Sequence, residues 1–187
     1  MRNWKHVRWT ETRQVADLLG WQEDLGDKAG LAPEVYFQDL MQAGRLNDAA
    51  FFLGQALPRF ETVAWAARAV RDLAPAPAPA GADADALKAA LLWVQDPSDV
   101  RRRASFEAAG KIREASPARL AALAAFFSGG SITPPEAPQT QPPKEMAGRL
   151  AAGAVLLAAA KSGQMEASLI RALADGARIA EKGLASP

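Results

Sequence analysis

The placement of proline constrains this chain more than any other feature of its sequence. Eight of the 13 prolines lie in two stretches, residues 75–83 and 131–144. Because proline fixes its backbone φ angle and donates no amide hydrogen bond, neither stretch fits a helix interior or a central strand. Both are therefore predicted to be extended connectors, and the second is long for a loop within a compact domain.

Outside the connectors the chain is rich in alanine, which accounts for 43 of its 187 residues. Alanine has the highest helix propensity, and no segment alternates apolar and polar residues for long enough to predict a strand. We therefore predict an all-α fold, with residues 1–187 forming one compact bundle of about nine helices. Residues 1–30 are expected to form an N-terminal extension, and the two connectors to lie over the surface of the bundle.

Residues that favour helix ends delimit the expected helices. These helices span residues 10–20, 33–44, 47 or 48 to 57, 58–74, 84–95, 98–110, 116–128, 145–161 and 165–182. The small residues of the last two helices predict a close approach of their backbones.

Composition excludes several classes of protein. Without cysteine the chain has no disulfide and no thiolate ligand or nucleophile, and with His6 as its one histidine it has no multi-histidine metal site. We expect no metal and no other cofactor. A formal net charge of +1 argues against a nucleic-acid partner. The longest apolar run, residues 150–160, is too short to span a membrane, and residues 1–10 lack an apolar targeting segment, so a cytoplasmic location is expected.

Catalysis is not indicated by any motif. The chain has no Gly-x-Ser-x-Gly element, and its carboxylates have the distribution of solvated helix faces. The sequence Ser-Gly-Gly-Ser at 128–131 has two interpretations, a phosphate-binding loop or the end of a helix. Glycines that follow a helix are typical of a helix end, and the lysine of a phosphate-binding loop is missing, so the second interpretation is favoured.

Charge is unevenly distributed along the chain. Residues 98–119, which include Arg101, Arg102 and Arg103, carry a formal +3, whereas residues 17–48 carry −5. Basic side chains on a helix without aromatic neighbours favour a solvated face over a nucleic-acid site. We expect these arginines to pair within the chain or to contact an acidic protein partner.

Trp65 stands out because helical spacing places it opposite the apolar stripe of its own helix, among Glu61, Arg68 and Asp72. Two interpretations follow. Another segment of the chain, such as a proline-rich connector, covers the indole, or the indole anchors a protein partner. The first is preferred, with Glu61, Arg68 and Asp72 left as the accessible surface.

Four stretches carry a family resemblance. They are residues 57–66 (LPRFETVAWA), 92–97 (LWVQDP), 126–131 (FFSGGS, with Pro134 and Pro135 after it) and 152–158 (AGAVLLA). Together they resemble an uncharacterised, alanine-rich bacterial domain family of unknown function that is often encoded near type VI secretion genes. The resemblance implies a bacterial secretion or effector context and no catalytic residue.

These observations favour a non-catalytic helical interaction protein that binds another protein, as an adaptor, chaperone or accessory factor of a type VI secretion or effector module. The alternative is an immunity protein that neutralises a cognate toxin. The sequence is also compatible with a homo-oligomer. The candidate partner surface comprises Glu61, Trp65, Arg68, Asp72, Arg101, Arg102 and Arg103.

Overall fold

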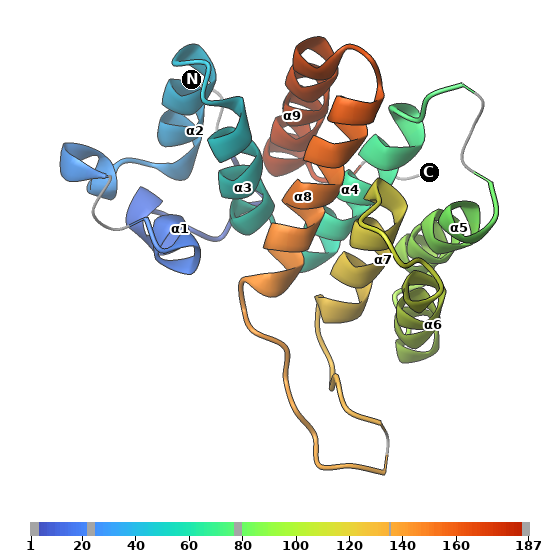
Figure 1. The fold of residues 1–187 in the computed structure, drawn as a ribbon. Coiled ribbons are helices and arrows are strands. Elements are labelled where there is room, and N and C mark those ends of the chain that lie inside the picture. The colour runs from blue at the N-terminus through green and yellow to red at the C-terminus, as the bar shows by residue number, and fades with distance from the viewer. Residues whose placement is uncertain (1–3, 22–24, 77–79, 135, 185–187) are drawn as a thin grey trace.

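The computed structural model describes residues 4–21, 25–76, 80–134 and 136–184 (Figure 1). These residues form α-helices and one short 3-10 helix, η2, and within the described ranges no strand is present. The all-α prediction is therefore confirmed. The elements are α1 (Thr12–Leu19), η2 (Gly26–Gly30), α2 (Pro33–Gln42), α3 (Leu46–Ala56), α4 (Arg59–Asp72), α5 (Ala82–Gln95), α6 (Asp99–Gly110), α7 (Pro117–Phe127), α8 (Met146–Lys161) and α9 (Met165–Lys182).

Most helix ends lie where the sequence predicts them, and the exceptions have local causes. The first helix begins at Thr12 rather than Thr10, because the Gln14 side-chain oxygen accepts the amides of both Thr10 and Glu11, at 2.8 and 3.0 Å. Glu11 thereby becomes the N-cap, in the pattern of a capping box. Gly20 ends α1 with a left-handed φ of 79°, as expected of a terminal glycine.

Helix α5 begins at Ala82, two residues earlier than the sequence predicts. Asp83 lies in its first turn, where a carboxylate is favoured by the helix dipole, and also accepts the hydroxyl of Ser116. Ser116 in turn accepts the Arg119 amide at 3.1 Å as the N-cap of α7, as predicted. The connector predicted at 75–83 is thus shorter, and its residues 77–79 lie outside the described ranges.

Helix α8 occupies the centre of the bundle and packs against α3, α4, α7 and α9 (Figure 1). Its contact with α3 depends on two glycines. A Cβ atom added to Gly54 would lie 2.7 Å from the carbonyl oxygen of Gly148, and one added to Gly148 would lie 2.6 Å from the side chain of Gln55. Small residues therefore bring α8 close to α3. The sequence predicts such a close approach between α8 and α9, so its partner helix was not the expected one.

The N-terminal segment packs into the same core rather than forming an extension. Trp4 is 8% exposed, its ring centroid lies 5.2 Å from that of Phe37, and its amide donates to the Glu34 carboxylate at 2.7 Å. The His6 amide donates to the Ala180 carbonyl at 2.9 Å, which ties this segment to the end of α9. Helix α1 thus packs against α3, η2 packs against α1, and the segment before α1 contacts α9 through His6.

The connector at 131–144 does not lie over the bundle. Figure 1 shows it leaving α7, extending away from the helices and returning to α8. Its arms are joined at the base, where the Ile132 amide donates to the Thr140 carbonyl at 2.8 Å, and Pro142 is buried against the bundle. The described residues nearer the tip, such as Pro134, Glu136 and Pro138, are exposed. The loop contains five prolines, but residues 134–139 include no large apolar side chain that could be buried against the bundle.

Candidate functional site

Trp65 is buried by the chain itself. Its side chain is 1% exposed, and the indole N–H donates to the Ala172 carbonyl of α9 at 2.8 Å. Gly176 makes this contact possible, since a Cβ atom there would lie 2.8 Å from the indole nitrogen. The covering segment is α9 and not a proline-rich connector, so Trp65 is removed from the candidate partner surface.

The preferred interpretation, that another segment of the chain covers Trp65, is thus confirmed. Its position opposite the apolar stripe is buried because α4 does not have one buried side only. The helix packs against α5, α7, α8 and α9, and almost every residue between Thr62 and Val70 is buried. An apolar stripe predicts one core-facing side only for a helix at the edge of a bundle. A position on the polar side of a central helix can therefore be equally buried.

Of the three charged residues predicted to surround Trp65 on the candidate partner surface, only two line the same groove. Arg68 and Asp72 line a groove of about 760 Å³ between α4 and α9. Glu61 lies about two turns before Arg68, is half-buried and is not part of the lining. Two ion pairs, Arg71 with Asp72 at 2.7 Å and Arg178 with Asp175 at 2.6 Å, occupy the same groove. Two of the four cations that line the groove are therefore paired with its two aspartates.

The three consecutive arginines of α6 have different environments. Arg101 is half-buried and pairs with Asp96 at 2.9 Å. Arg102 is only 5% exposed, and Arg103 is half-buried and pairs with Asp99 at 2.8 Å. The expected pairing within the chain is thus confirmed. The interpretation as a solvated basic face is wrong for Arg102.

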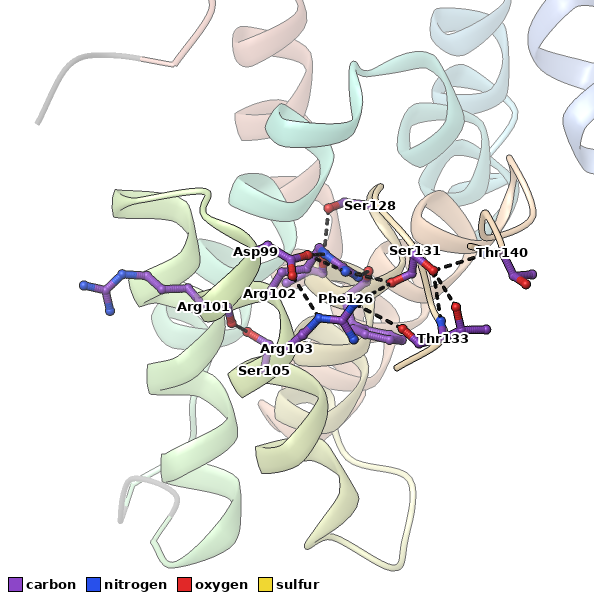
Figure 2. A network of polar contacts seen from close by, with 11 residues as sticks. Asp99, Arg101, Arg102, Arg103, Ser105, Phe126, Ser128, Ser131, Thr133 and Thr140 are labelled. Atoms are coloured by element: carbon purple, nitrogen blue, oxygen red, sulfur yellow. Dashed lines mark hydrogen bonds and ion pairs between the residues drawn. The ribbon is translucent and has the colours of Figure 1, made fainter. Parts of the chain in front are cut away.

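Arg102 is the centre of the polar network drawn in Figure 2. Its guanidinium donates to the Asp99 carboxylate at 2.6 Å, to the Phe126 carbonyl at 2.9 Å and to the Ser131 carbonyl at 2.8 Å. The same group lies over the Phe126 ring, 4.9 Å from its centroid. These contacts satisfy the buried charge and attach the C-terminal end of α7 to α6.

Arg102 also explains the glycine at position 130. Gly130 has a left-handed φ of 68°, and a Cβ atom there would lie 3.0 Å from the arginine Nε. The Ser128 and Ser131 carbonyls of this turn accept hydrogen bonds from Arg59 and Arg102. A phosphate-binding loop would direct amide N–H groups at an anion, whereas this turn directs carbonyl oxygens at cations. The turn therefore supports the interpretation of residues 128–131 as a helix end.

The base of the projecting loop is held by Arg103, the residue that follows Arg102. Arg103 donates to the Thr133 carbonyl at 3.1 Å. The Ser131 and Thr133 hydroxyls are 2.7 Å apart, and the Thr140 amide donates to the Ser131 hydroxyl at 3.1 Å (Figure 2). The first arm of the loop is therefore fixed to α6 at its base, and the second arm is bonded to the first. The sequence does not reveal the link to α6, because 28 to 30 residues separate the partners.

Asp99 pairs with both arginines. The hydrogen bond from Arg102, and next the one from Arg103, hold the pKa of the Asp99 carboxyl below its ordinary value of 3.8. The aspartate is in the first turn of α6, where a negative charge is favoured by the helix dipole. At neutral pH the Asp99 carboxyl is therefore ionised.

Two large apolar side chains of α6 remain exposed near this network. Val100 is 79% exposed and Phe106 is 47% exposed, with the Phe106 ring centroid 4.4 Å from that of Phe126. We call Val100, Arg103, Phe106 and the described residues of 131–141 the α6–loop surface. It combines an exposed aromatic ring, a partly paired arginine and a stiff projecting loop.

The fold and this surface define the chain as an all-α bundle with a projecting loop. Among the described residues no three His, Asp or Glu side chains gather closely enough to hold a metal ion, and no helix in the described ranges is long and apolar enough to cross a membrane.

Comparison with known families gives one match. The model of DUF6931, a family of unknown function, matches residues 36–180, and the chain belongs to this family. No curated protein and no solved structure matches the chain.

Proposed function

We propose that this protein is a non-catalytic interaction protein that binds another protein through the α6–loop surface. The observation that carries the proposal is the loop itself, which projects from the bundle while the buried Arg102 holds its base. A loop that is ordered before binding loses less conformational entropy in a complex. The exposed Phe106 ring and the half-buried Arg103 beside it are residue types that favour binding hot spots.

The secretion context is a narrower proposal. It rests on the resemblance of the four sequence stretches, and on that basis the partner belongs to a type VI secretion or effector module, with this protein as its adaptor, chaperone or accessory factor. An immunity protein that binds a cognate toxin is the alternative. Both act on a protein partner in the cytoplasm, and a homo-oligomer is compatible with either.

An enzymatic function has less support. The shifted pKa values among the described residues belong to Lys28, Arg71 and Asp99, and each follows first from a hydrogen bond to an ion-pair partner. Such pairs at accessible positions are typical of structural contacts and not of a catalytic centre, which shifts pKa values by desolvation in a cleft.

Co-expression with a toxin encoded beside the gene distinguishes the adaptor from the immunity protein. Rescue of the host cell favours immunity, whereas altered loading or secretion of the effector without rescue favours the adaptor. The surface is tested with Phe106→Ser, whose aromatic ring is 47% exposed on α6. The matched control is Ile170→Ser, an apolar residue 42% exposed on α9.

We expect Phe106→Ser to abolish the rescue or loading phenotype and to weaken association with the partner, while Ile170→Ser leaves both unchanged. Circular dichroism of each variant checks that it is folded. If folded Phe106→Ser protein binds the partner as the unchanged protein does, and a variant without the loop tip does so too, the α6–loop surface is not the contact site.

A further inference from the structure

A second site lies where the N-terminal segment meets the beginnings of α4 and α8. It is a pocket of about 400 Å³ whose walls include Arg8, Arg59 and Lys144. These three cations come from distant parts of the sequence, namely the N-terminal segment, the first residue of α4 and the end of the projecting loop. No Asp or Glu is among the described residues that line it. The described lining residues therefore carry three positive charges and no negative charge.

Hydrogen bonds between distant segments build this pocket. The Trp9 indole donates to the Gln55 carbonyl at 3.2 Å, and the Gln55 amide group donates to the Glu145 carbonyl at 2.7 Å. Arg149 of α8 donates to the Leu19 carbonyl at the end of α1, at 3.3 Å. The walls are thus held in place by the fold itself, which reduces the cost of ordering a site when a ligand binds.

The three cations are available for a ligand. Within the described ranges neither Arg8 nor Lys144 forms an ion pair, and both side chains are exposed. Arg59 makes one hydrogen bond, to the Ser128 carbonyl at 3.3 Å, and this contact leaves its charge without a counterion. Bringing like charges together is unfavourable in the absence of an anion, so a bound anion would relieve this repulsion.

We propose that this pocket binds a small anion that bears a diphosphate group. Arginine matches phosphate oxygens through its paired N–H groups, and lysine adds a point charge, so two arginines and one lysine suit a multiply charged phosphate. The first turns of α4 and α8 also line the pocket and add favourable N-terminal dipoles. A volume of about 400 Å³ lies in the range of small-ligand sites, and the Trp9 ring supplies an apolar wall.

Nucleic acid fits the pocket less well than a small ligand. A polyanion gains affinity from many phosphate contacts along an extended basic surface, whereas this chain has a formal net charge of +1. The enclosing walls favour a ligand that enters as a whole. Inorganic pyrophosphate and a nucleoside diphosphate share the recognised group, and they are distinguished by comparing pyrophosphate with ADP.

Isothermal titration calorimetry at constant ionic strength tests the proposal, with pyrophosphate and ADP as the probes. We expect saturable binding of at least one probe by the unchanged protein. The double variant Arg8→Gln, Lys144→Gln removes two cations that form no ion pair within the described ranges, although the Arg8 guanidinium lies 5.9 Å from the centroid of the Trp9 ring. It is expected to bind at least tenfold more weakly. The control double variant Lys88→Gln, Arg171→Gln loses the same charge at exposed positions outside the pocket and is expected to retain the affinity.

The relative affinities of pyrophosphate and ADP show which part of the ligand the pocket recognises. Equal affinity for the two probes identifies the diphosphate group as sufficient, and tighter binding of ADP shows that the nucleoside also contacts the walls. Two results would overturn the proposal: no saturable binding of either probe to protein that circular dichroism shows to be folded, or an equal loss of affinity in the two double variants, which would indicate non-specific attraction.

Discussion

Replacing Trp65 with alanine is the sharpest test of how this bundle is held together. The indole is 1% exposed and lies against α9, where its N–H donates to the Ala172 carbonyl at 2.8 Å. Removing a buried tryptophan leaves a cavity that costs about 3–5 kcal/mol of unfolding free energy. Loss of the buried hydrogen bond adds ~1 kcal/mol. We therefore expect Trp65→Ala to lower the unfolding free energy by about 4–6 kcal/mol.

The measurement is urea unfolding followed by far-ultraviolet circular dichroism, because the other tryptophans complicate fluorescence. A loss of this size is a large part of the ~5–15 kcal/mol that stabilises a typical domain, so Trp65→Ala protein can be partly unfolded before urea is added. Trp65→Phe then serves as a milder variant. It retains an aromatic ring and loses the N–H donor, and it is expected to cost about 1–3 kcal/mol.

A matched control for this prediction is Phe106→Ala, since Phe106 is a large aromatic residue that is 47% exposed. Partial burial predicts a loss of about 1 kcal/mol. If Trp65→Ala unfolds within about 1 kcal/mol of the unchanged protein, α9 does not cover the indole, and a partner-binding role for Trp65 would have to be reconsidered.

Three further predictions concern α6 and the loop. Arg102→Met should lower the unfolding free energy by about 2–4 kcal/mol in urea titrations, because it removes the buried donor that holds the loop base, whereas Arg101→Met, at an accessible ion pair, should change it by less than about 0.5 kcal/mol. Because the Asp99 pKa is lower in the folded than in the unfolded protein, its contribution to stability is present above the ordinary value of 3.8 and is lost as the pH falls through the lower folded value. Stability measured against pH in this acidic range should therefore fall less steeply for Asp99→Asn than for the unchanged protein, and equal slopes would contradict the pairing. Replacing residues 134–139 with a short Gly-Ser linker should shift the thermal midpoint by only about 2–4 °C, since the described residues there are mostly exposed; a larger decrease would show that the tip packs on the bundle.

Local sequence signals determine the helices of this protein to within a few residues. Pro33 and Pro117 begin helices, Gly20 ends one, and Ser116 caps α7, as the sequence predicts. These features act over one helical turn, so they can be read without knowledge of the fold. The early start of α5 is an exception, because Asp83 is held by Ser116 from a distant part of the chain.

Contacts between residues that are distant in the sequence determine which side chains form the candidate sites. The sequence alone does not reveal these contacts. Arg101, Arg102 and Arg103 are adjacent and chemically identical, yet only Arg102 is buried, because it faces carbonyls at the end of α7. The pocket of Arg8, Arg59 and Lys144 was not predicted at all. No local signal could have found it, since its residues are up to 136 positions apart in the sequence.

What the sequence by itself determined is therefore the all-α class, the position of most helices and the extended nature of the loop at 131–144. Backbone propensity and proline stereochemistry are local properties, and they act in the same way in any fold. The tertiary structure alone decided that α9 covers Trp65, that Arg102 is buried and that the N-terminal segment joins the bundle. Each of these depends on which surfaces meet, and packing between helices that are distant in sequence is set by the shapes of whole faces, such as the glycine positions on α8 and α9 that admit a neighbour.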